Sequence, residues 1–287
     1  MNGLRNMMDK MKPTFSKGGK LSFLGSTFEA FETFLFVPDT TTRRGAHIRD
    51  ANDMKRTMIM VVVALMPALF FGFYNTGLQH FAMLGQTASW WDCTWFGFLR
   101  VLPIIVVSYV VGLGIEFAFA QARGHEVNEG FLVTGLLIPM IMPVDIPLWM
   151  VALGTAFAVI FGKEVFGGTG MNVFNPALLA RAFIFFAYTP SISGETVWYA
   201  GLSRGAIPVD GFSGATALEQ LGTTGTMAYS PMDAFLGFIP GSIGETSTLA
   251  ILIGAAILLY TGVASWRSML SVFAGGLLMG WLFQALG

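Results

Sequence analysis

The chain contains a series of long apolar runs that begin after Arg56, and these runs restrict it to a membrane fold. A helix needs about 20 apolar residues to cross the hydrocarbon core of a bilayer. The chain is 54% hydrophobic and only 11% charged, whereas soluble domains carry about 25% charged residues. We therefore predict an all-α polytopic membrane protein with about seven transmembrane segments. The candidate segments are residues 57–77, 98–122, 131–142, 148–162, 173–188, 249–266 and 269–286.

Some of these segments are short or broken. The third contains Pro139 and is followed directly by Pro143, and the fourth and fifth flank a Gly-rich polar turn at residues 162–175. Segments interrupted by Pro and Gly are typical of broken or tilted helices around a buried site, as in many transporters. The alternative is a set of plain short helices without a functional role.

The first 56 residues differ from the rest because they hold ten Lys and Arg against six acids. They contain no short apolar region followed by a small-residue cleavage site, so they are not a signal peptide. Residues 28–37 are apolar but interrupted by Glu29 and Glu32. This pattern indicates an interfacial amphipathic helix, too short and too charged to span. We interpret residues 1–56 as a cytoplasmic arm.

The basic residues also predict the orientation, because they favour the cytoplasmic side of a membrane. With a cytoplasmic N-terminus, all the segments alternate consistently across the membrane. External loops are then expected at residues 78–97, at Asp145 and at residues 189–248. The long loop 189–248 separates five membrane segments in residues 57–188 from two in residues 249–287.

The charge balance and the cysteine count exclude several classes of protein. With 16 Lys and Arg against 17 Asp and Glu, the chain lacks the basic surface of a nucleic-acid-binding protein. Cys93 is its only cysteine, which excludes a disulfide framework and a cluster or zinc site held by Cys of this chain alone. The three histidines, His47, His80 and His125, have no metal-ligand spacing, so no metal site is predicted. The chain also has no dinucleotide fingerprint and no P-loop.

The long loop carries the run Asp210-Gly211-Phe212-Ser213-Gly214-Ala215-Thr216. The small residues around Thr216 leave its hydroxyl open to a bulky modifying enzyme. Asp210 and Ser213 are groups that can bind a metal–phosphate during transfer. The alternative from spacing alone is a flexible Gly/Ser loop.

This run resembles the motif in which FMN is joined to Thr by a phosphoester bond. Further stretches resemble one family, the flavin-bearing membrane subunit (the B-subunit) of the sodium-translocating NADH:quinone reductase, and they occur in family order along almost the whole chain. They are DMKR (53–56), GHEVNEG (124–130), KEVFGGTG (163–170), NPAL (175–178), PGSIGE (240–245) and ASWR (264–267).

The resemblance implies a bacterial inner-membrane component of a six-subunit complex. Thr216 would bear FMN on the periplasmic side, within a motif that includes Asp210, Ser213, Gly214 and Ala215. Electrons would come from another external flavin subunit and pass through the FMN and a riboflavin to quinone, coupled to Na⁺ transport. Oxidation of NADH and the iron–sulfur centres would belong to other subunits.

Gly112 and Glu116 form a second candidate site in the second apolar run. They are four residues apart, so they share one helix face. Glu116 lies about 10 Å along the helix from Arg123 at the cytoplasmic boundary. It is either a carboxylate that pairs near the interface or a member of an ion or quinone pathway. The resemblance favours the second role for both residues, with Gly112 letting a quinone ring approach the backbone, and it gives Glu29 a similar role.

Arg181 is a cation in an apolar run, where a lone guanidinium costs at least ~2.5 kcal/mol and needs a partner. The candidates are Glu164, a carbonyl of a broken segment or a flavin phosphate. A structural pair is the favoured role. Glu245 and Asp233 in the long loop are equally consistent with solvated surface acids.

Two other functions remain open on the sequence. One is the D-subunit of the related ferredoxin:NAD⁺ oxidoreductase complex, against which the long basic N-terminal stretch argues. The other is a non-redox small-solute transporter. The sequence stops at Gly287 within an apolar segment, whereas chains of the resembled family run on for several helices. We therefore expect it to correspond to about the first 70% of such a chain.

Overall fold

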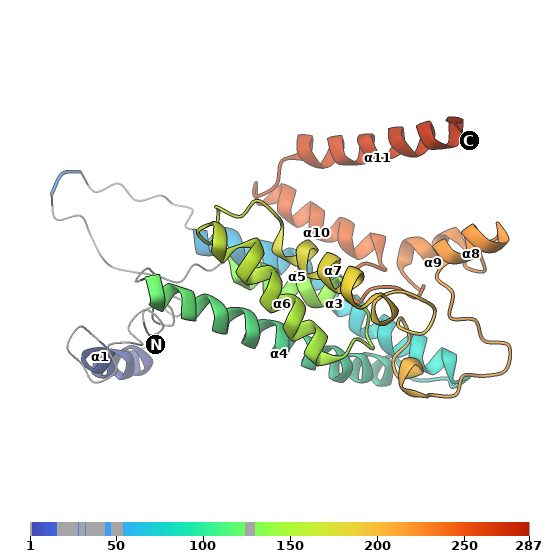
Figure 1. Cartoon of the computed structure of the whole chain (residues 1–287), viewed down its shortest axis with the longest axis horizontal. Helices are drawn as coiled ribbons and strands as arrows, with labels where there is room; N and C mark the ends of the chain where they lie inside the picture. The colour runs from blue at the N-terminus through green and yellow to red at the C-terminus, as the bar shows by residue number, and fades with distance from the viewer. Residues whose placement is uncertain are drawn as a thin grey trace.

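A computed structural model describes residues 2–15, 28, 32, 44–46, 54–123 and 130–286. All secondary structure within these residues is helical, and Figure 1 shows how the helices are arranged. The helices of the bundle are α3 (Met54–Met83), α4 (Trp90–Arg123), α5 (Phe131–Met140), α6 (Leu148–Gly162), α7 (Pro176–Ala187) and α10 (Thr248–Tyr260). The others are α1 (Asn2–Phe15), η2 (Glu164–Phe166), η3 (Thr189–Ser191), η4 (Leu202–Arg204), α8 (Ala217–Thr224), α9 (Pro231–Leu236) and α11 (Trp266–Leu286).

Each of the seven predicted segments coincides with one apolar helix. The predicted segment 148–162 has the same bounds as α6. The predicted bounds of the loop 78–97 are too wide, because α3 continues to Met83 and α4 already begins at Trp90. Ser89 and Asp92 cap the start of α4 reciprocally: each side chain accepts a hydrogen bond from the backbone N–H of the other. A Ser followed three residues later by an acid is a helix start that is visible in the sequence.

The apolar helices fall into two length classes within the part of the chain described. Four are long and apolar enough to cross a membrane, namely 56–83 in α3, α4, residues 148–166 in α6 and η2, and α11. The other three, α5, α7 and α10, have 10, 12 and 13 residues. At 1.5 Å per residue, a helix of 10 residues covers about half of a ~30 Å hydrocarbon core. The predicted short segments are therefore real features of the fold.

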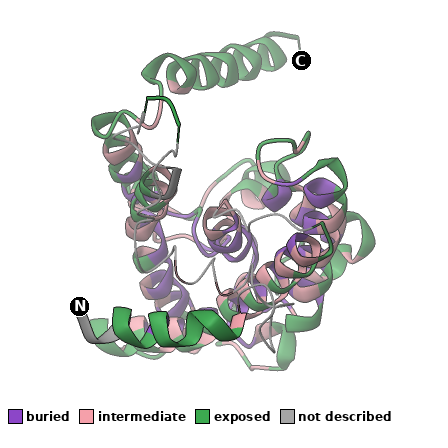
Figure 2. Cartoon of the chain, turned by 90° about the vertical axis from the view of Figure 1, so that its left-hand side faces the viewer, coloured by how far each residue is buried: buried purple, intermediate pink, exposed green. Residues whose placement is uncertain are grey.

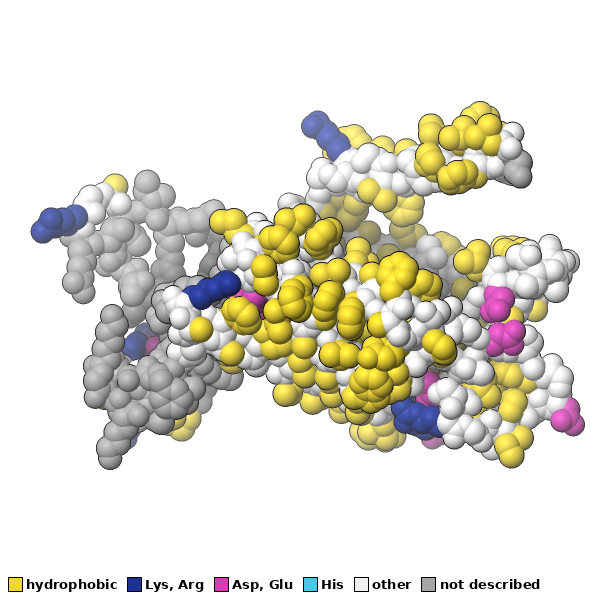
Figure 3. Space-filling view, in the orientation of Figure 1, with side chains coloured by type: hydrophobic (Ala, Val, Ile, Leu, Met, Phe, Trp, Pro, Cys, Tyr) yellow, Lys and Arg dark blue, Asp and Glu magenta, His cyan; other side chains and the backbone are white. Residues whose placement is uncertain are grey.

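The helices pack lengthwise into one bundle, and α11 lies apart from it (Figures 1 and 2). We refer to the Arg123 end of the bundle, where α4 finishes, and to the Trp90 end, where it begins. Side chains of α3, α4, α5, α6 and α7 form the core, with Val101, Ile138 and Val151 fully buried. In Figure 3, hydrophobic side chains cover the middle of the visible face and charged ones gather toward its two ends. This distribution fits a bundle that lies across a bilayer.

Residues 239–247 lie inside the bundle rather than in an external loop. Ile243 N–H donates to Met142 O at 3.2 Å, and Gly244 N–H donates to Met140 O at 2.7 Å. The Nδ2 atom of Asn75 on α3 donates to Ile239 O at 3.0 Å. The predicted bounds of the loop, 189–248, thus include a segment that packs against the end of α5. Irregular backbone is tolerated at membrane depth only where protein groups satisfy it, and these bonds do so.

Candidate functional site

A buried ion pair links α4 to the end of α6. The Lys163 ammonium group donates to Oε1 of Glu116, and each side chain is only 4% exposed. Lys163 is the C-cap residue of α6, where the helix dipole favours a cation. Both residues lie in or beside apolar stretches of the sequence, and the structure joins them across 47 positions.

A second ion pair lies beside the first. Nη1 of Arg123 is 3.5 Å from Oε2 of Glu164, and Nη2 of Arg123 donates to the Glu164 backbone O at 2.7 Å. Glu164 is buried together with Lys163 and Glu116. The four formal charges sum to zero, which is how a low-dielectric interior tolerates them. Glu164 was a candidate partner of Arg181 and pairs with Arg123 instead.

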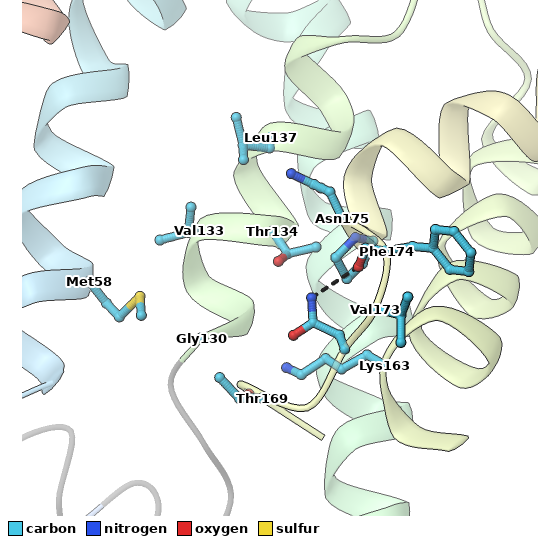
Figure 4. A pocket seen from close by; sticks show the side chains of 12 residues that line it. Met58, Gly130, Val133, Thr134, Leu137, Lys163, Thr169, Val173, Phe174 and Asn175 are labelled. Carbon is cyan, nitrogen blue, oxygen red and sulfur yellow. Dashed lines mark hydrogen bonds between the residues drawn. The ribbon is translucent and has the colours of Figure 1, made fainter. Parts of the chain in front are cut away.

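A pocket of about 340 Å³ opens next to Lys163, between α3, α5 and the start of α7. Its polar lining consists of one ammonium group, two hydroxyls and two amides, and Figure 4 shows Lys163 extending toward Thr169. Oγ1 of Thr169 is buried and has no hydrogen-bond partner within the described residues. The lining residues are Met58, Gly130, Val133, Thr134, Leu137, Lys163, Thr169, Asn172, Val173, Phe174, Asn175 and Pro176.

The turn between α6 and α7 shapes this pocket. Asn175 caps α7, because its Oδ1 accepts from Ala177 N–H at 2.9 Å and Leu178 N–H at 3.4 Å. Gly168 and Gly170 in the turn have φ of 98° and 89°, a conformation that residues with a side chain rarely adopt. The N-terminal ends of α5 and α7 both lie at the pocket. The positive ends of the two helix dipoles make the pocket suited to electron-rich ligand groups.

Gly112 lies directly against an aromatic ring of α5. A Cβ atom at Gly112 would overlap the ring of Phe131. The Lys163 Nζ is 5.9 Å from the centre of the same ring. Gly112 and Glu116 therefore share a buried face of α4, as their spacing predicted. The Phe131 ring lies where the sequence led us to expect a quinone ring.

Arg181 of α7 is held at the broken end of α5. It donates to the backbone O of Ile141, to Oγ of Ser242 at 3.0 Å and to Oε2 of Glu245 at 3.3 Å. A carbonyl of the broken segment was one of its expected partners, and this expectation is confirmed. Glu245 is thus an ion-pair partner, although its side chain is half exposed.

Helix α8, which Thr216 caps, lies beyond the Trp90 end of the bundle, whereas Glu116 lies near the Arg123 end of α4 (Figure 1). Oγ1 of Thr216 accepts from Glu219 N–H at 3.3 Å. Thr216 is half-buried, Gly214 and Ala215 are buried, and Asp210 and Ser213 are exposed. The structure thus keeps the Thr216 motif separate from the α4 site. Glu29, a further candidate, lies outside the described residues.

Aromatic side chains anchor the chain around Thr216. The ring of Phe212 packs edge-on against Tyr199, with ring centres 4.9 Å apart. Burial and a hydrogen bond with Tyr229 raise the pKa of Tyr199 above its usual value. At Gly214 a Cβ atom would overlap the backbone O of Glu195. These contacts hold in place the segment of chain that leads to Thr216.

Asp145 is a buried residue that the sequence marked only as a turn. Its carboxylate accepts from Gly201 N–H at 2.9 Å, Ser203 N–H at 3.2 Å and Ser203 Oγ at 2.7 Å. Nε of Arg204 is 3.8 Å from Oδ1 of Asp145. Asp145 thereby ties the turn before α6 to the chain that leads to Thr216. The only sequence sign of this role was an acid between two apolar segments.

The broken helices surround buried charges, and apolar side chains cover the middle of the bundle. These features define a helical multi-pass membrane protein. Comparison with known proteins identifies its family. The family model described as "NQR2, RnfD, RnfE family" matches residues 41–286. The chain therefore belongs to the NQR2, RnfD, RnfE family.

Its relatives include several proteins named as the B-subunit of Na⁺-translocating NADH-quinone reductase. The one from Chromohalobacter salexigens is 48% identical over 310 residues, which cover 99% of this chain and 74% of that protein. The one from Pseudomonas aeruginosa is 45% identical over 313 residues, with 99% and 76% covered. The one from Haemophilus influenzae is 43% identical over 320 residues, again with 99% and 76% covered.

Proposed function

We propose that this chain is the membrane B-subunit of a Na⁺-translocating NADH-quinone reductase. The observation that carries the proposal is the 48% identity to a protein of that name along 99% of the chain. It would work in the bacterial inner membrane with the other members of a six-subunit complex. It would have about seven membrane segments, a cytoplasmic N-terminus and a periplasmic Thr216 loop, as the distribution of basic residues favours.

We propose further that FMN is bound covalently at Thr216. The Thr216 hydroxyl lies at the start of α8, where a phosphate ester would meet the positive end of the helix. The side chain is half-buried, so it is open on one side to a modifying enzyme. Asp210 and Ser213, both exposed nearby in the motif, would bind the phosphate donor during attachment. Bound FMN supplies the capacity to accept and pass on electrons.

The pocket beside Lys163 fits a riboflavin held without a covalent bond. Its volume of about 340 Å³ lies in the range of small-molecule sites. Oδ1 of Asn175 caps α7 and Nδ2 of Asn172 donates to Phe174 O, so Nδ2 of Asn175 can donate to the polar edge of a flavin ring and Oδ1 of Asn172 can accept from it. Thr169, whose buried hydroxyl has no partner within the described residues, would gain one. These three residues would orient the ring, and Val133 and Leu137 would pack against its apolar part.

Glu116 and Gly112 are proposed members of the quinone and Na⁺ pathway, together with Glu29. Carboxylate and carbonyl oxygens are the ligands that hard cations prefer. Glu116 is buried in the bundle, so its carboxylate needs a cation beside it, either Lys163 or a transported ion. Access of a quinone ring to Gly112 requires the Phe131 ring to move aside.

The covalent flavin provides the test of this function. After denaturing electrophoresis of the purified complex, the band of this chain should fluoresce as a flavin. Thr216→Ala should abolish that fluorescence, whereas Thr226→Ala, at an exposed Thr in the same loop, should not. A parent band without fluorescence, or an unchanged signal in Thr216→Ala, would contradict the proposal and favour a non-redox transporter.

The family model also covers RnfD and RnfE, so the membrane component of the related ferredoxin:NAD⁺ oxidoreductase is a second candidate. By resemblance, that component also carries FMN on Thr, and the fluorescence test does not separate the two. Quinone reduction by NADH in membranes does. Turnover with NADH and quinone that increases with Na⁺ concentration supports the quinone reductase. Absence of this turnover supports the component of the ferredoxin:NAD⁺ oxidoreductase.

A further inference from the structure

Lys163 takes part in two neighbouring sites. Its ammonium group pairs with Glu116, and its side chain also lines the pocket next to Thr169 (Figure 4). Lys163 and Glu116 are each 4% exposed, so water cannot replace a partner that either one loses. A charge at such a depth must be compensated by a protein group or by a bound ion.

Two other cations of the helices described, Arg123 and Arg181, already have partners. Arg123 is bound to Glu164 through a side-chain contact of 3.5 Å and a backbone contact of 2.7 Å. Arg181 is bound at the broken end of α5. Among the described residues that line the pocket, Lys163 is the only one with a formal charge. Within the described lining, negative charge that enters the pocket is therefore attracted by one cation, Lys163.

We propose that Lys163 is a positioning residue that controls whether Glu116 can bind Na⁺. The proposal rests on the flavin pocket proposed above. With an uncharged ligand in the pocket, Lys163 remains paired with Glu116. If the pocket held a reduced flavin, the flavin would supply negative charge there, and the flexible Lys163 side chain would turn toward that charge. The Glu116 carboxylate would then lack a counter-ion and would bind Na⁺.

The charges balance in this exchange. NADH supplies the electrons through the complex, and one added negative charge in the pocket is matched by one Na⁺ at Glu116. No covalent bond forms or breaks. Because Lys163 can compensate only one of the two anions, the ligand and the cation are linked thermodynamically, and the linkage is reciprocal.

Equilibrium binding of ²²Na⁺ to the assembled complex, oxidised or reduced with dithionite, tests this role without turnover. The parent complex should bind Na⁺ about tenfold more tightly when reduced, within the usual range of coupling between sites. Lys163→Gln should bind Na⁺ equally in both states, because Glu116 is free of its ammonium partner in each. Glu116→Gln should bind Na⁺ at this site roughly tenfold to a hundredfold more weakly in both states, because it lacks the charge.

Two further variants complete the design. Lys163→Arg keeps the cation and should keep the difference between the two states. Arg267→Gln removes an exposed cation outside the pocket and serves as the control. Lys163→Met removes both the charge and the hydrogen-bond donor of Lys163. If this variant fails to assemble, the test is made with Lys163→Gln, whose side-chain amide still donates a hydrogen bond to Glu116. A tenfold difference that persists in Lys163→Gln overturns the proposal.

The content of non-covalent flavin separates this proposal from the one on which it rests. Asn172→Leu should lose that flavin if it is bound in the pocket. Retained flavin in Asn172→Leu would overturn the flavin pocket, and with it the control of Glu116 by a flavin. Lost flavin in Asn172→Leu, together with an unchanged Na⁺ difference in Lys163→Gln, would overturn the role of Lys163 alone.

Discussion

Ser108 on α4 donates its hydroxyl hydrogen to the backbone O of Gly135 on α5 at 2.9 Å. In a regular helix that oxygen would accept from the N–H four residues later, but this position is Pro139, which has no N–H. Ser108 is fully buried, so its hydroxyl replaces the missing donor inside the bundle. The bond joins α4 and α5 one turn from Gly112 and two turns from Glu116, and it stabilises the short helix that begins at the pocket.

Ser108→Ala should therefore destabilise the protein by roughly 1–2 kcal/mol, because it leaves the Gly135 oxygen without a donor. The thermal midpoint of the detergent-solubilised complex measures the effect. Thr261→Val is the matched control, because Thr261 also donates to a helix carbonyl but is exposed at the end of α10. Equal thermal midpoints for Ser108→Ala and Thr261→Val would show that the buried bond contributes no more to stability than the exposed one.

Glu116→Gln should lower turnover and weaken its dependence on Na⁺. The amide keeps the shape of the carboxylate but loses the charge that holds a cation. An interaction with a charged group contributes about 1.5–3 kcal/mol, so the Na⁺ concentration for half-maximal rate should rise roughly tenfold to a hundredfold. Turnover measured against NaCl concentration gives both values. An unchanged rate and Na⁺ profile would refute the role of Glu116.

The sequence predicted the helices well because long apolar runs are a local property. It also placed Gly112 and Glu116 on one face of a helix, since that follows from the helical period alone. It did not predict that Lys163 is the partner of Glu116. Periodicity shows which face of a helix is buried but not which distant residue packs there. The choice depends on how α4 and α6 meet at their ends.

The same limit explains the error at residues 239–247. This stretch is rich in Gly, Pro and Ser, a composition typical of external loops. Whether it can enter the bundle depends on partners from other helices, such as Asn75 on α3 and Arg181 on α7. Polar residues inside apolar runs are the visible sign of such partners in a sequence, but they do not say which distant segment they bind.

Asp145→Ala should release the chain between α7 and Thr216 from the turn before α6. The substitution leaves the N–H groups of Gly201 and Ser203 without their acceptor, at a cost of roughly 1–3 kcal/mol for the buried donor of Gly201. Faster limited proteolysis in residues 200–216 is the expected result. Asp233→Ala, which removes an exposed helix cap, should cost only about 1 kcal/mol and leave the cleavage of that segment unchanged.

Tyr199→Phe should make the protein less sensitive to alkaline pH. Burial in the folded protein raises the pKa of Tyr199. Its phenolic hydroxyl therefore keeps its proton at about pH 10, where the same hydroxyl in the unfolded chain loses it. The contribution of Tyr199 to stability is therefore complete below about pH 10 and falls as the pH rises further. Thermal midpoints at about pH 8 and pH 10.5 should differ less in Tyr199→Phe than in the parent. Tyr260→Phe, at an exposed position, controls for the loss of a hydroxyl; an equal alkaline loss in the parent and in Tyr199→Phe would contradict the assignment.

Gly112→Ala distinguishes packing from quinone access on the face of α4. The new methyl group would overlap the ring of Phe131, and overpacking of this kind costs about 1–3 kcal/mol. Gly114→Ala is the matched control two residues away, because a Cβ atom there has open space. If Gly112 serves only packing, adding Phe131→Leu to Gly112→Ala should restore both stability and the KM for quinone. If the quinone ring approaches Gly112, the double variant should regain its thermal midpoint while its KM for quinone stays raised. An unchanged midpoint in Gly112→Ala would show that the Phe131 ring moves aside readily, as quinone access requires.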